Sequence, residues 1–221
     1  MHQILLYYKY IHIEDPEALH QSQRVLCERL GLKGRILVAH EGINGTCEGT
    51  LEATEAYITE MKKDARFSDI VYKKSQSAGV SFPRLSIKVR KEIVSGHLGD
   101  DDINPQTMTG KYLKPDELKA WFDRGEDFVI VDMRNDYEQD VGVFKGSVRS
   151  GMKTFRDLPK TAMELEPVKA KKILTVCTGG VRCEKASGYL VKKGFKDVYQ
   201  LDGGIVSFME KYPGEFFKGK L

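Results

Sequence analysis

The spacing of apolar residues divides the first part of the chain into short strands and longer helices. The expected strands cover residues 4–10, 34–40, 70–74 and 85–90, and the expected helices cover 15–30 and 51–62. Asp15 followed by Pro16 is typical of a helix start, because aspartate caps free N–H groups and proline suits the first turn. Asn44-Gly45 indicates a nearby turn. From these elements we expect a ferredoxin-like α+β sandwich, with a helix pair on an antiparallel sheet.

The second part of the chain alternates fully apolar strands with helices. The expected strands cover 128–132, 172–176 and 198–201, and the expected helices cover 114–123, 184–193 and 204–211. Continuous apolar runs are typical of parallel strands buried on both faces. We therefore expect a doubly wound parallel sheet, whose ligands bind at the carboxyl ends of the strands. Asp132 and Cys177 both fall at such ends, which predicts that they face one crevice.

A polar stretch separates the two patterns. Residues 96–110 contain an acidic run, glycines and a proline, and they show no apolar period. Such composition is typical of a boundary between domains. The sequence therefore predicts a first domain over 1–95, a linker over 96–110 and a second domain over 111–221.

Composition indicates a globular protein. The 221 residues are 41% hydrophobic, and no apolar run approaches the length of about 18 residues that a membrane-spanning helix needs. The first ten residues lack the basic segment and cleavage site of a signal peptide. The four cysteines show neither Cys-x-x-Cys nor zinc-finger spacing, so we expect free thiols and a cytoplasmic location.

The net charge of +3 is too small to indicate a nucleic-acid partner by itself. Lysine pairs do occur in the first domain, and such pairs are usually solvated faces. They nevertheless permit RNA binding, and the candidates for it are Lys62, Lys63, Lys73 and Lys74.

The most informative segment is the cysteine loop. Cys177 ends an apolar strand and is followed by Thr-Gly-Gly-Val, Arg182 and a helix. Backbone N–H groups of such a loop can point at the sulfur, while the helix N-terminus and Arg182 add positive charge. All three favour the nucleophilic thiolate. The alternative is a buried strand cysteine beside an ordinary turn.

Cys183 opens the predicted helix and allows two interpretations. Its thiol could attack a persulfide on Cys177 and form a disulfide, or it could be a small buried residue. Neither cysteine indicates a metal site, because the loop supplies no third ligand.

Other cysteine chemistries fit less well. Four residues separate Cys177 from Arg182, whereas cysteine phosphatases of related fold place one residue more between them. A shorter loop leaves less room for a tetrahedral phosphate. A Cys–His protease is disfavoured because all five histidines precede residue 111, which leaves no local imidazole as base.

Several motifs of the second domain together resemble a rhodanese domain over residues 111–215. They are Asp132-Met-Arg134, Phe144-Lys-Gly146, Cys177-Thr-Gly-Gly-Val-Arg182 and Leu201-Asp-Gly-Gly204. The resemblance implies that Cys177 carries sulfur as a persulfide and that Asp132 and Arg134 support the site. It also implies that a cradle surrounds the persulfide, formed by Thr178, Gly179, Gly180, Val181 and Arg182.

A motif of the first domain makes the resemblance more specific than a rhodanese domain alone. Gly34-Arg-Ile-Leu-Val-Ala-His-Glu-Gly-Ile-Asn-Gly-Thr46, followed by the rhodanese unit, resembles the tRNA uridine hydroxylase family. The implied fold class is α/β, with a ferredoxin-like (acylphosphatase-like) α+β sandwich followed by a doubly wound parallel-sheet rhodanese domain. The implied reaction is oxygen-dependent formation of 5-hydroxyuridine at position 34. It would take tRNA as partner, in the cytoplasm, with neither membrane nor DNA involved.

Residue chemistry alone predicts sulfur transfer, and hydroxylation is implied only by the resemblance. No flavin, haem or two-histidine-one-carboxylate iron signature is evident, so we expect no cofactor and no metal. Molecular oxygen as co-substrate is implied by the resemblance alone. The role of Glu41–Asn44 is not assigned by this chemistry beyond a possible hairpin turn.

Two departures and two alternatives accompany this interpretation. Many members of that family continue into a cysteine-rich tail that this sequence lacks, and residues 147–153 differ from the usual proline- and aspartate-bearing stretch. The first alternative is a thiosulfate or persulfide sulfurtransferase whose first domain docks a protein partner or which uses a small acceptor. The second is a non-catalytic binding module, which the presence of Cys177 disfavours.

Overall fold

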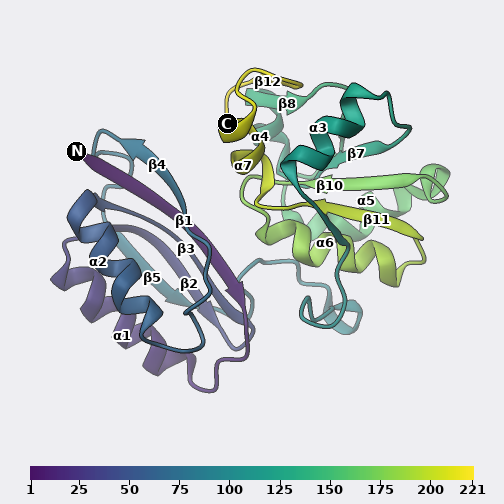
Figure 1. Ribbon diagram of the computed structural model, residues 1–221. Coiled ribbons are helices and arrows are strands. Elements are labelled where there is room, and N and C mark those ends of the chain that lie inside the picture. Colours follow the sequence, from purple (N-terminus) through teal and green to yellow (C-terminus); the bar gives the residue numbers. More distant parts are fainter. The chain divides into compact units, whose positions relative to one another are not determined.

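The computed structural model describes residues 1–221, which form two compact units over Met1–Ile93 and Val94–Leu221. Each unit has its own sheet and its own buried core (Figure 1). No helix in either unit has the length and apolar character that crossing a bilayer requires.

The first unit is an α+β sandwich. Its elements in chain order are β1 (His2–Tyr10), α1 (Pro16–Arg29), β2 (Lys33–Ala39), β3 (Gly42–Thr50), α2 (Leu51–Lys62), β4 (Lys73–Ser77) and β5 (Leu85–Val89). The sheet order is β4-β1-β3-β2-β5. The predicted ferredoxin-like sandwich is confirmed, but the expectation of an antiparallel sheet is wrong at one edge, where β2 and β5 are parallel and make the sheet mixed. The central strand β3 was also not among the expected strands.

Strand β3 occupies the centre of this sheet, where the sequence indicated only a turn. The turn lies at His40 and Glu41, and Asn44-Gly45 belongs to the strand itself. Gly45 is required there by packing, because a Cβ atom at this position would lie 2.3 Å from Cζ of Tyr7. In the sequence Gly45 suggests a turn, but in the structure it leaves room for the Tyr7 ring to lie across β3.

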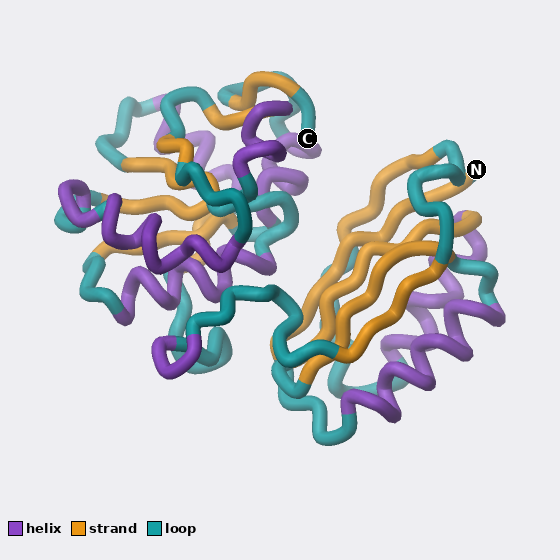
Figure 2. The backbone as a smooth tube through the Cα atoms, turned by 180° about the vertical axis from the view of Figure 1, so that it is seen from behind, coloured by secondary structure: helices purple, strands orange, loops and turns teal.

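Helices α1 and α2 cover one face of the sheet, and no other helix of this unit lies on the opposite face (Figure 2). A buried polar chain runs through the core beneath them. Tyr7 and Tyr57 share a hydrogen bond, Tyr57 donates to Gln23 Oε1 at 2.6 Å, and Gln23 Nε2 lies 3.1 Å from Met61 Sδ. Burial raises the pKa of Tyr7 and Tyr57 well above the usual value, so both hydroxyls stay neutral.

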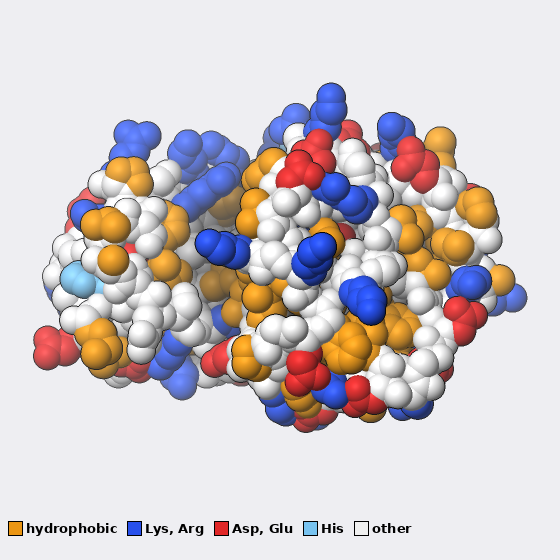
Figure 3. Space-filling view, turned by 90° about the horizontal axis from the view of Figure 1, so that it is seen from above, with side chains coloured by type: hydrophobic (Ala, Val, Ile, Leu, Met, Phe, Trp, Pro, Cys, Tyr) orange, Lys and Arg blue, Asp and Glu red, His pale blue; other side chains and the backbone are white.

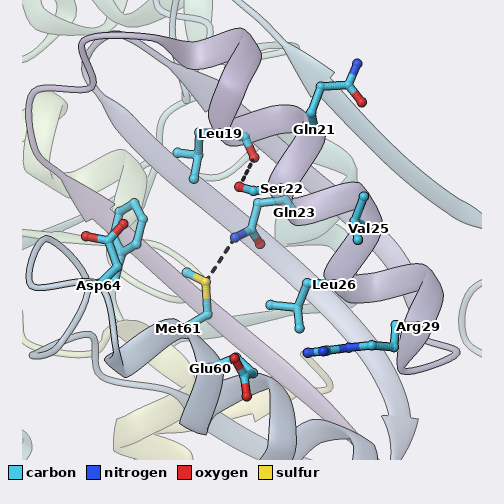
Figure 4. A pocket seen from close by; sticks show the side chains of 11 residues that line it. Leu19, Gln21, Ser22, Gln23, Val25, Leu26, Arg29, Glu60, Met61 and Asp64 are labelled. Atoms are coloured by element: carbon cyan, nitrogen blue, oxygen red, sulfur yellow. Dashed lines mark hydrogen bonds between the residues drawn. The ribbon is translucent and has the colours of Figure 1, made fainter.

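A hollow of about 480 Å³ lies between α1 and α2 (Figure 4). The Gln23 side chain points from α1 toward Met61 within it, and apolar wall is supplied by Leu19 and Leu26. The lining contains neither cysteine nor histidine. We therefore assign no chemistry to this hollow.

The second unit contains a five-stranded parallel sheet in the order β6-β11-β10-β7-β9 and a separate antiparallel pair, β8 with β12. Its elements are β6 (Lys111–Leu113), α3 (Pro115–Asp123), β7 (Val129–Asp132), α4 (Asp136–Val141), β8 (Gly142–Phe144), β9 (Val148–Arg149), α5 (Leu158–Glu164), β10 (Lys172–Val176), α6 (Val181–Lys192), β11 (Asp197–Leu201), α7 (Gly204–Lys211) and β12 (Phe217–Gly219). The predicted parallel sheet is confirmed.

Two cores bury the two faces of this parallel sheet. One cluster joins α5 and α6 to the strands, and the other joins α3 and α7. Ile173 belongs to the first and Leu174 to the second, because successive side chains of a strand point to opposite faces. Helices on both faces make the unit doubly wound, and the carboxyl ends of its strands are left to position the site.

The segment that the sequence predicts as a linker, residues 96–110, packs on α6 as part of the second unit. Lys185 of α6 is fully buried, and its Nζ lies 3.1 Å from Asp102 Oδ2. Lys193 Nζ lies 2.7 Å from Asp101 Oδ2. The acidic run therefore binds one lysine within α6 and one at the C-terminal end of that helix.

Candidate active site

Cys177 directly follows β10, at the carboxyl edge of the parallel sheet. Its neighbour Val176 pairs with Asp132 of β7, and the N–H of Met133 donates to the Val176 carbonyl at 2.8 Å. The two strand ends that the sequence singled out thus lie side by side. The Cys177 side chain is fully buried.

The loop after Cys177 turns its backbone toward the sulfur. The Gly180 N–H donates to Sγ at a distance of 3.2 Å, and a second backbone N–H comes from Cys183. Gly180 has φ of 103°, a left-handed conformation that favours glycine. Helix α6 begins at the next residue, which places Cys183 in its first turn.

The environment of Cys177 favours its thiolate. Burial by itself raises the pKa of this thiol, but hydrogen bonds from Cys183, the charge of Arg182 and the Gly180 N–H outweigh burial and lower it. Burial and the nearby Cys177 raise the pKa of Cys183 well above its usual value. Cys183 is therefore a thiol that donates a hydrogen bond to the Cys177 thiolate, a geometry that serves either of its two interpretations.

Arg182 is held by an acidic residue that the sequence analysis missed. Its Nη1 lies 2.6 Å from Glu138 Oε2, and its Nη2 lies 2.8 Å from Glu138 Oε1. Arg182 Nη2 also donates a hydrogen bond of 3.2 Å to the Thr178 hydroxyl oxygen. Burial raises the pKa of Glu138, but the bonds from Arg182 outweigh this and lower it, so both partners are charged. The Glu138 carboxylate therefore partly offsets the positive charge that Arg182 presents to Cys177. Arg182 also fixes the loop in place through its bonds to Glu138 and Thr178.

Asp132 and Arg134 form a buried ion pair behind this arrangement. Arg134 Nη2 lies 2.6 Å from Asp132 Oδ2, and it also donates to the Gly142 carbonyl at 2.5 Å. Their side-chain bonds go to each other and to backbone, not to Cys177. The pair fixes the turn between β7 and α4, and α4 carries Glu138.

Gly204, at the start of α7, packs directly against the cysteine loop. Gly204 has φ of 71°, and a Cβ atom there would lie 2.6 Å from the Thr178 carbonyl oxygen. The N–H groups of Ile205 and Val206, in the first turn of α7, donate to the carbonyls of Cys177 and Thr178 at 2.9 and 3.0 Å. The first turn of α7 therefore holds the cysteine loop from behind.

No imidazole takes part in the hydrogen bonding of Cys177, which involves Gly180 and Cys183. All five histidines precede residue 111, but one of them belongs to the second unit of the structure. His97 lies in the segment packed on α6 and so belongs to the second unit. No group of three or more histidine, cysteine or acidic side chains is arranged to hold a metal ion.

The four lysines named for RNA binding lie in the first unit but do not form one patch. Lys62 ends α2, and Lys63 pairs with Glu60 at 2.7 Å. Lys74 of β4 pairs with Glu55 of α2. Lys73 points to the opposite face of the sheet, where its Nζ lies 5.3 Å from the centroid of the Tyr8 ring.

Comparison with known families identifies both units. Residues 2–93 match the model of the UPF0176 acylphosphatase like domain, and residues 114–211 match that of the rhodanese-like domain. A solved rhodanese-like domain from Anabaena sp. is 21% identical, with a TM-score of 0.42 over 51% of this chain and 81% of that one.

Curated relatives match both units together. A tRNA uridine(34) hydroxylase of Bacillus licheniformis is 50% identical over 222 residues, which cover 99% of this chain and 68% of that protein. A protein of the same name from Staphylococcus saprophyticus is 48% identical over 223 residues, covering 100% of this chain and 70% of that one. A third, from Oceanobacillus iheyensis, is also 48% identical, covering 100% and 68%.

Proposed function

The chain belongs to the tRNA uridine(34) hydroxylase family, and we propose that it hydroxylates uridine 34 of tRNA with Cys177 as the reacting side chain. The observation that carries this proposal is the 50% identity over 99% of the chain to a relative of that name. The product is 5-hydroxyuridine, and molecular oxygen is the co-substrate. The enzyme is thus an oxidoreductase that acts on RNA.

Three features support Cys177 as the reactive group. It lies at the carboxyl edge of the parallel sheet, its pKa is lowered, and Gly180 and Cys183 donate hydrogen bonds to its sulfur. Thiolate is the nucleophilic form of cysteine, so these donors keep the residue ready to react at neutral pH. Gly179, Val181 and the other loop residues form the cradle around it.

The burial of Cys177 favours a persulfide-type role. The thiol sulfur is closed off from solvent, whereas the outer sulfur of a persulfide lies about 2 Å farther from the backbone. The loop amides and the Cys183 thiol can stabilise negative charge on such a group. Asp132 and Arg134 act at a distance, by fixing the turn that carries Glu138 toward Arg182.

The proposed partner is tRNA, and the proposed site of action is the cytoplasm. The chain carries a net charge of +3, and the face shown in Figure 3 presents lysine and arginine side chains among acidic and apolar ones. Phosphate contacts from such side chains give salt-dependent affinity, so binding of tRNA should weaken as the salt concentration rises.

A sulfurtransferase remains the second candidate, because the rhodanese-like match covers the cysteine loop. Mass spectrometry of tRNA nucleosides from cells that lack the protein separates the two. We expect loss of 5-hydroxyuridine and its derivatives, with thiolated nucleosides unchanged. Loss of a thiolated nucleoside with 5-hydroxyuridine intact would replace hydroxylation by sulfur transfer.

A further inference from the structure

The sheet of the first unit has a face that its own helices leave uncovered, which we call the open face. Leu5 and Tyr7 of β1 point to the helix side, where the ring of Tyr7 lies 5.8 Å from that of Tyr57 of α2. Alternate residues of a strand point the other way. Leu6 and Tyr8 therefore lie on the open face.

The strand register brings side chains from all five strands into rows across the open face. One row follows directly from the pairing of neighbouring strands: Lys73, Leu6, Thr46, Arg35 and Ser86. The next row, two residues farther along each strand, contains Tyr8, Asn44, Leu37 and Lys88. Cations thus lie on both sides of the sheet centre, with an aromatic ring between them.

The charge of the open face is positive. Arg35 and Lys88 are exposed and form no ion pair. The carboxylate on this face, Glu48, is 2% exposed and accepts hydrogen bonds from the Ser77 hydroxyl and the Ser81 N–H. Its charge is therefore held within the fold, while the two cations are available to a ligand.

The open face offers both kinds of group that bind single-stranded nucleic acid. Tyr8 is half-buried, and Lys73 Nζ lies over its ring at 5.3 Å from the centroid, so a base that stacks there would displace this ammonium toward a phosphate. With strands spaced by about 4.8 Å, Arg35 and Lys73 are separated by about 14 Å across the sheet. Unpaired bases stack on aromatic rings of a sheet while cations hold the phosphates, whereas paired bases are already stacked on each other.

We propose that this open face binds the unpaired anticodon loop of tRNA, with Tyr8 as a stacking platform and Arg35, Lys73 and Lys88 as phosphate contacts. This inference rests on the proposed function, and it names the surface that engages the substrate. It moves the RNA contacts away from the lysines around α2, because Lys63 and Lys74 are paired with glutamates of that helix.

The test measures binding of a fluorescent anticodon stem-loop RNA to the full chain, by anisotropy at several salt concentrations. The double variant Arg35→Gln/Lys88→Gln should weaken binding about tenfold or more, and it should reduce the slope of log K against log salt by about 1.4, as loss of two single-strand contacts requires. Tyr8→Leu should weaken binding about fivefold or more and leave the slope unchanged.

The matched control is Lys62→Gln/Lys63→Gln, which removes the same charge from the end of α2 and should bind like the wild type. Equal losses in both double variants, or a loss in the control alone, would overturn the inference. So would a dimer that Arg35→Gln/Lys88→Gln dissociates while RNA affinity stays unchanged, because the open face would then bind a second copy.

A second measurement needs no substitution and so does not depend on the folding of a variant. Cross-linking of a 4-thiouridine-substituted stem-loop to the wild type, followed by peptide mass spectrometry, should label peptides of β1, β2, β4 or β5. Labels confined to α1 or α2 would contradict the inference. Loss of 5-hydroxyuridine in cells lacking the protein tests the reaction separately, so unchanged binding by the open-face variants would reject this surface while leaving the function standing.

Discussion

Arg182 of the cysteine loop and Glu138 of α4 form a two-point ion pair, with oxygen–nitrogen distances of 2.6 and 2.8 Å. Both side chains are largely buried, with 17% and 21% of their surfaces exposed. The pair connects the loop after β10 to the helix after β7. The positive group expected to activate Cys177 is thus also the group that fixes the loop.

Replacing Arg182 by lysine should therefore impair the site even though the charge is kept. A single ammonium cannot make the two parallel hydrogen bonds that a guanidinium makes with a carboxylate. We expect modification of tRNA to fall at least tenfold, with a stability loss of about 1–3 kcal/mol. Turnover assays and denaturant unfolding measure the two effects. Near-normal turnover would show that the backbone amides of the loop suffice.

The Cys177 thiol should titrate below the ordinary cysteine pKa of about 8.5. Because its pKa is lowered, the thiolate persists as pH falls below that value and is lost only when pH passes the lowered pKa. The ultraviolet absorbance of the thiolate as a function of pH, compared between the wild type and Cys177→Ala, gives the midpoint without a reagent that must reach the buried sulfur. Burial raises the pKa of Cys27 to about 12, so that residue adds no thiolate in this pH range.

A companion pair of variants tests the hydrogen bond from Cys183. Cys183→Ser keeps a donor beside the Cys177 sulfur, whereas Cys183→Ala removes it. We expect the midpoint of the Cys177 thiolate absorbance to lie at higher pH in the alanine variant than in the serine variant. Identical midpoints near 8.5 in both would remove the electrostatic basis of the site.

Gly204→Ala should disturb the cysteine loop from behind. The added Cβ atom would lie 2.6 Å from the Thr178 carbonyl oxygen, and the backbone is left-handed there. Gly125→Ala is the matched control, because φ is 66° but no atom lies within 4 Å of the added Cβ. We expect the control to lose about 1 kcal/mol of stability and keep its activity. Gly204→Ala should lose more stability and most activity, and equal behaviour of the two would contradict this role.

Asp102→Asn should destabilise the second unit because it removes the carboxylate that pairs with buried Lys185. Loss of one partner of a buried pair costs about 3 kcal/mol, and partial exposure of Asp102 places our expectation at about 2 kcal/mol. Asp100→Asn changes the same charge in the same acidic run and should cost under about 0.5 kcal/mol, as surface substitutions usually do. Thermal unfolding compares them, and equal melting temperatures would argue against a packed role for residues 96–110.

The strand, turn and helix around Cys177 could be predicted from the sequence because their signals are local. An apolar strand, adjacent glycines, an arginine and a helix follow one another without a gap, and the structure has Gly180 in the left-handed conformation before α6. The parallel sheet was predictable for the same reason, since each strand is a continuous apolar run.

Features that depend on distant partners were not predictable in this way. Glu138 lies in α4, a helix of six residues without an apolar period, and its partner Arg182 is 44 residues away. Its one available signal was its position in the first turn of a helix after Asp132-Met-Arg134. The acidic run resembled a linker because the lysines that bind it lie more than eighty residues later. The open face appears only once the strand register is known.

The most direct test of the central claim is complementation of cells that lack this protein, followed by mass spectrometry of tRNA nucleosides. The account predicts that the wild-type gene restores 5-hydroxyuridine at position 34 and that Cys177→Ser, expressed at the same level, does not. Restoration by Cys177→Ser would contradict the assignment of Cys177 as the reacting side chain.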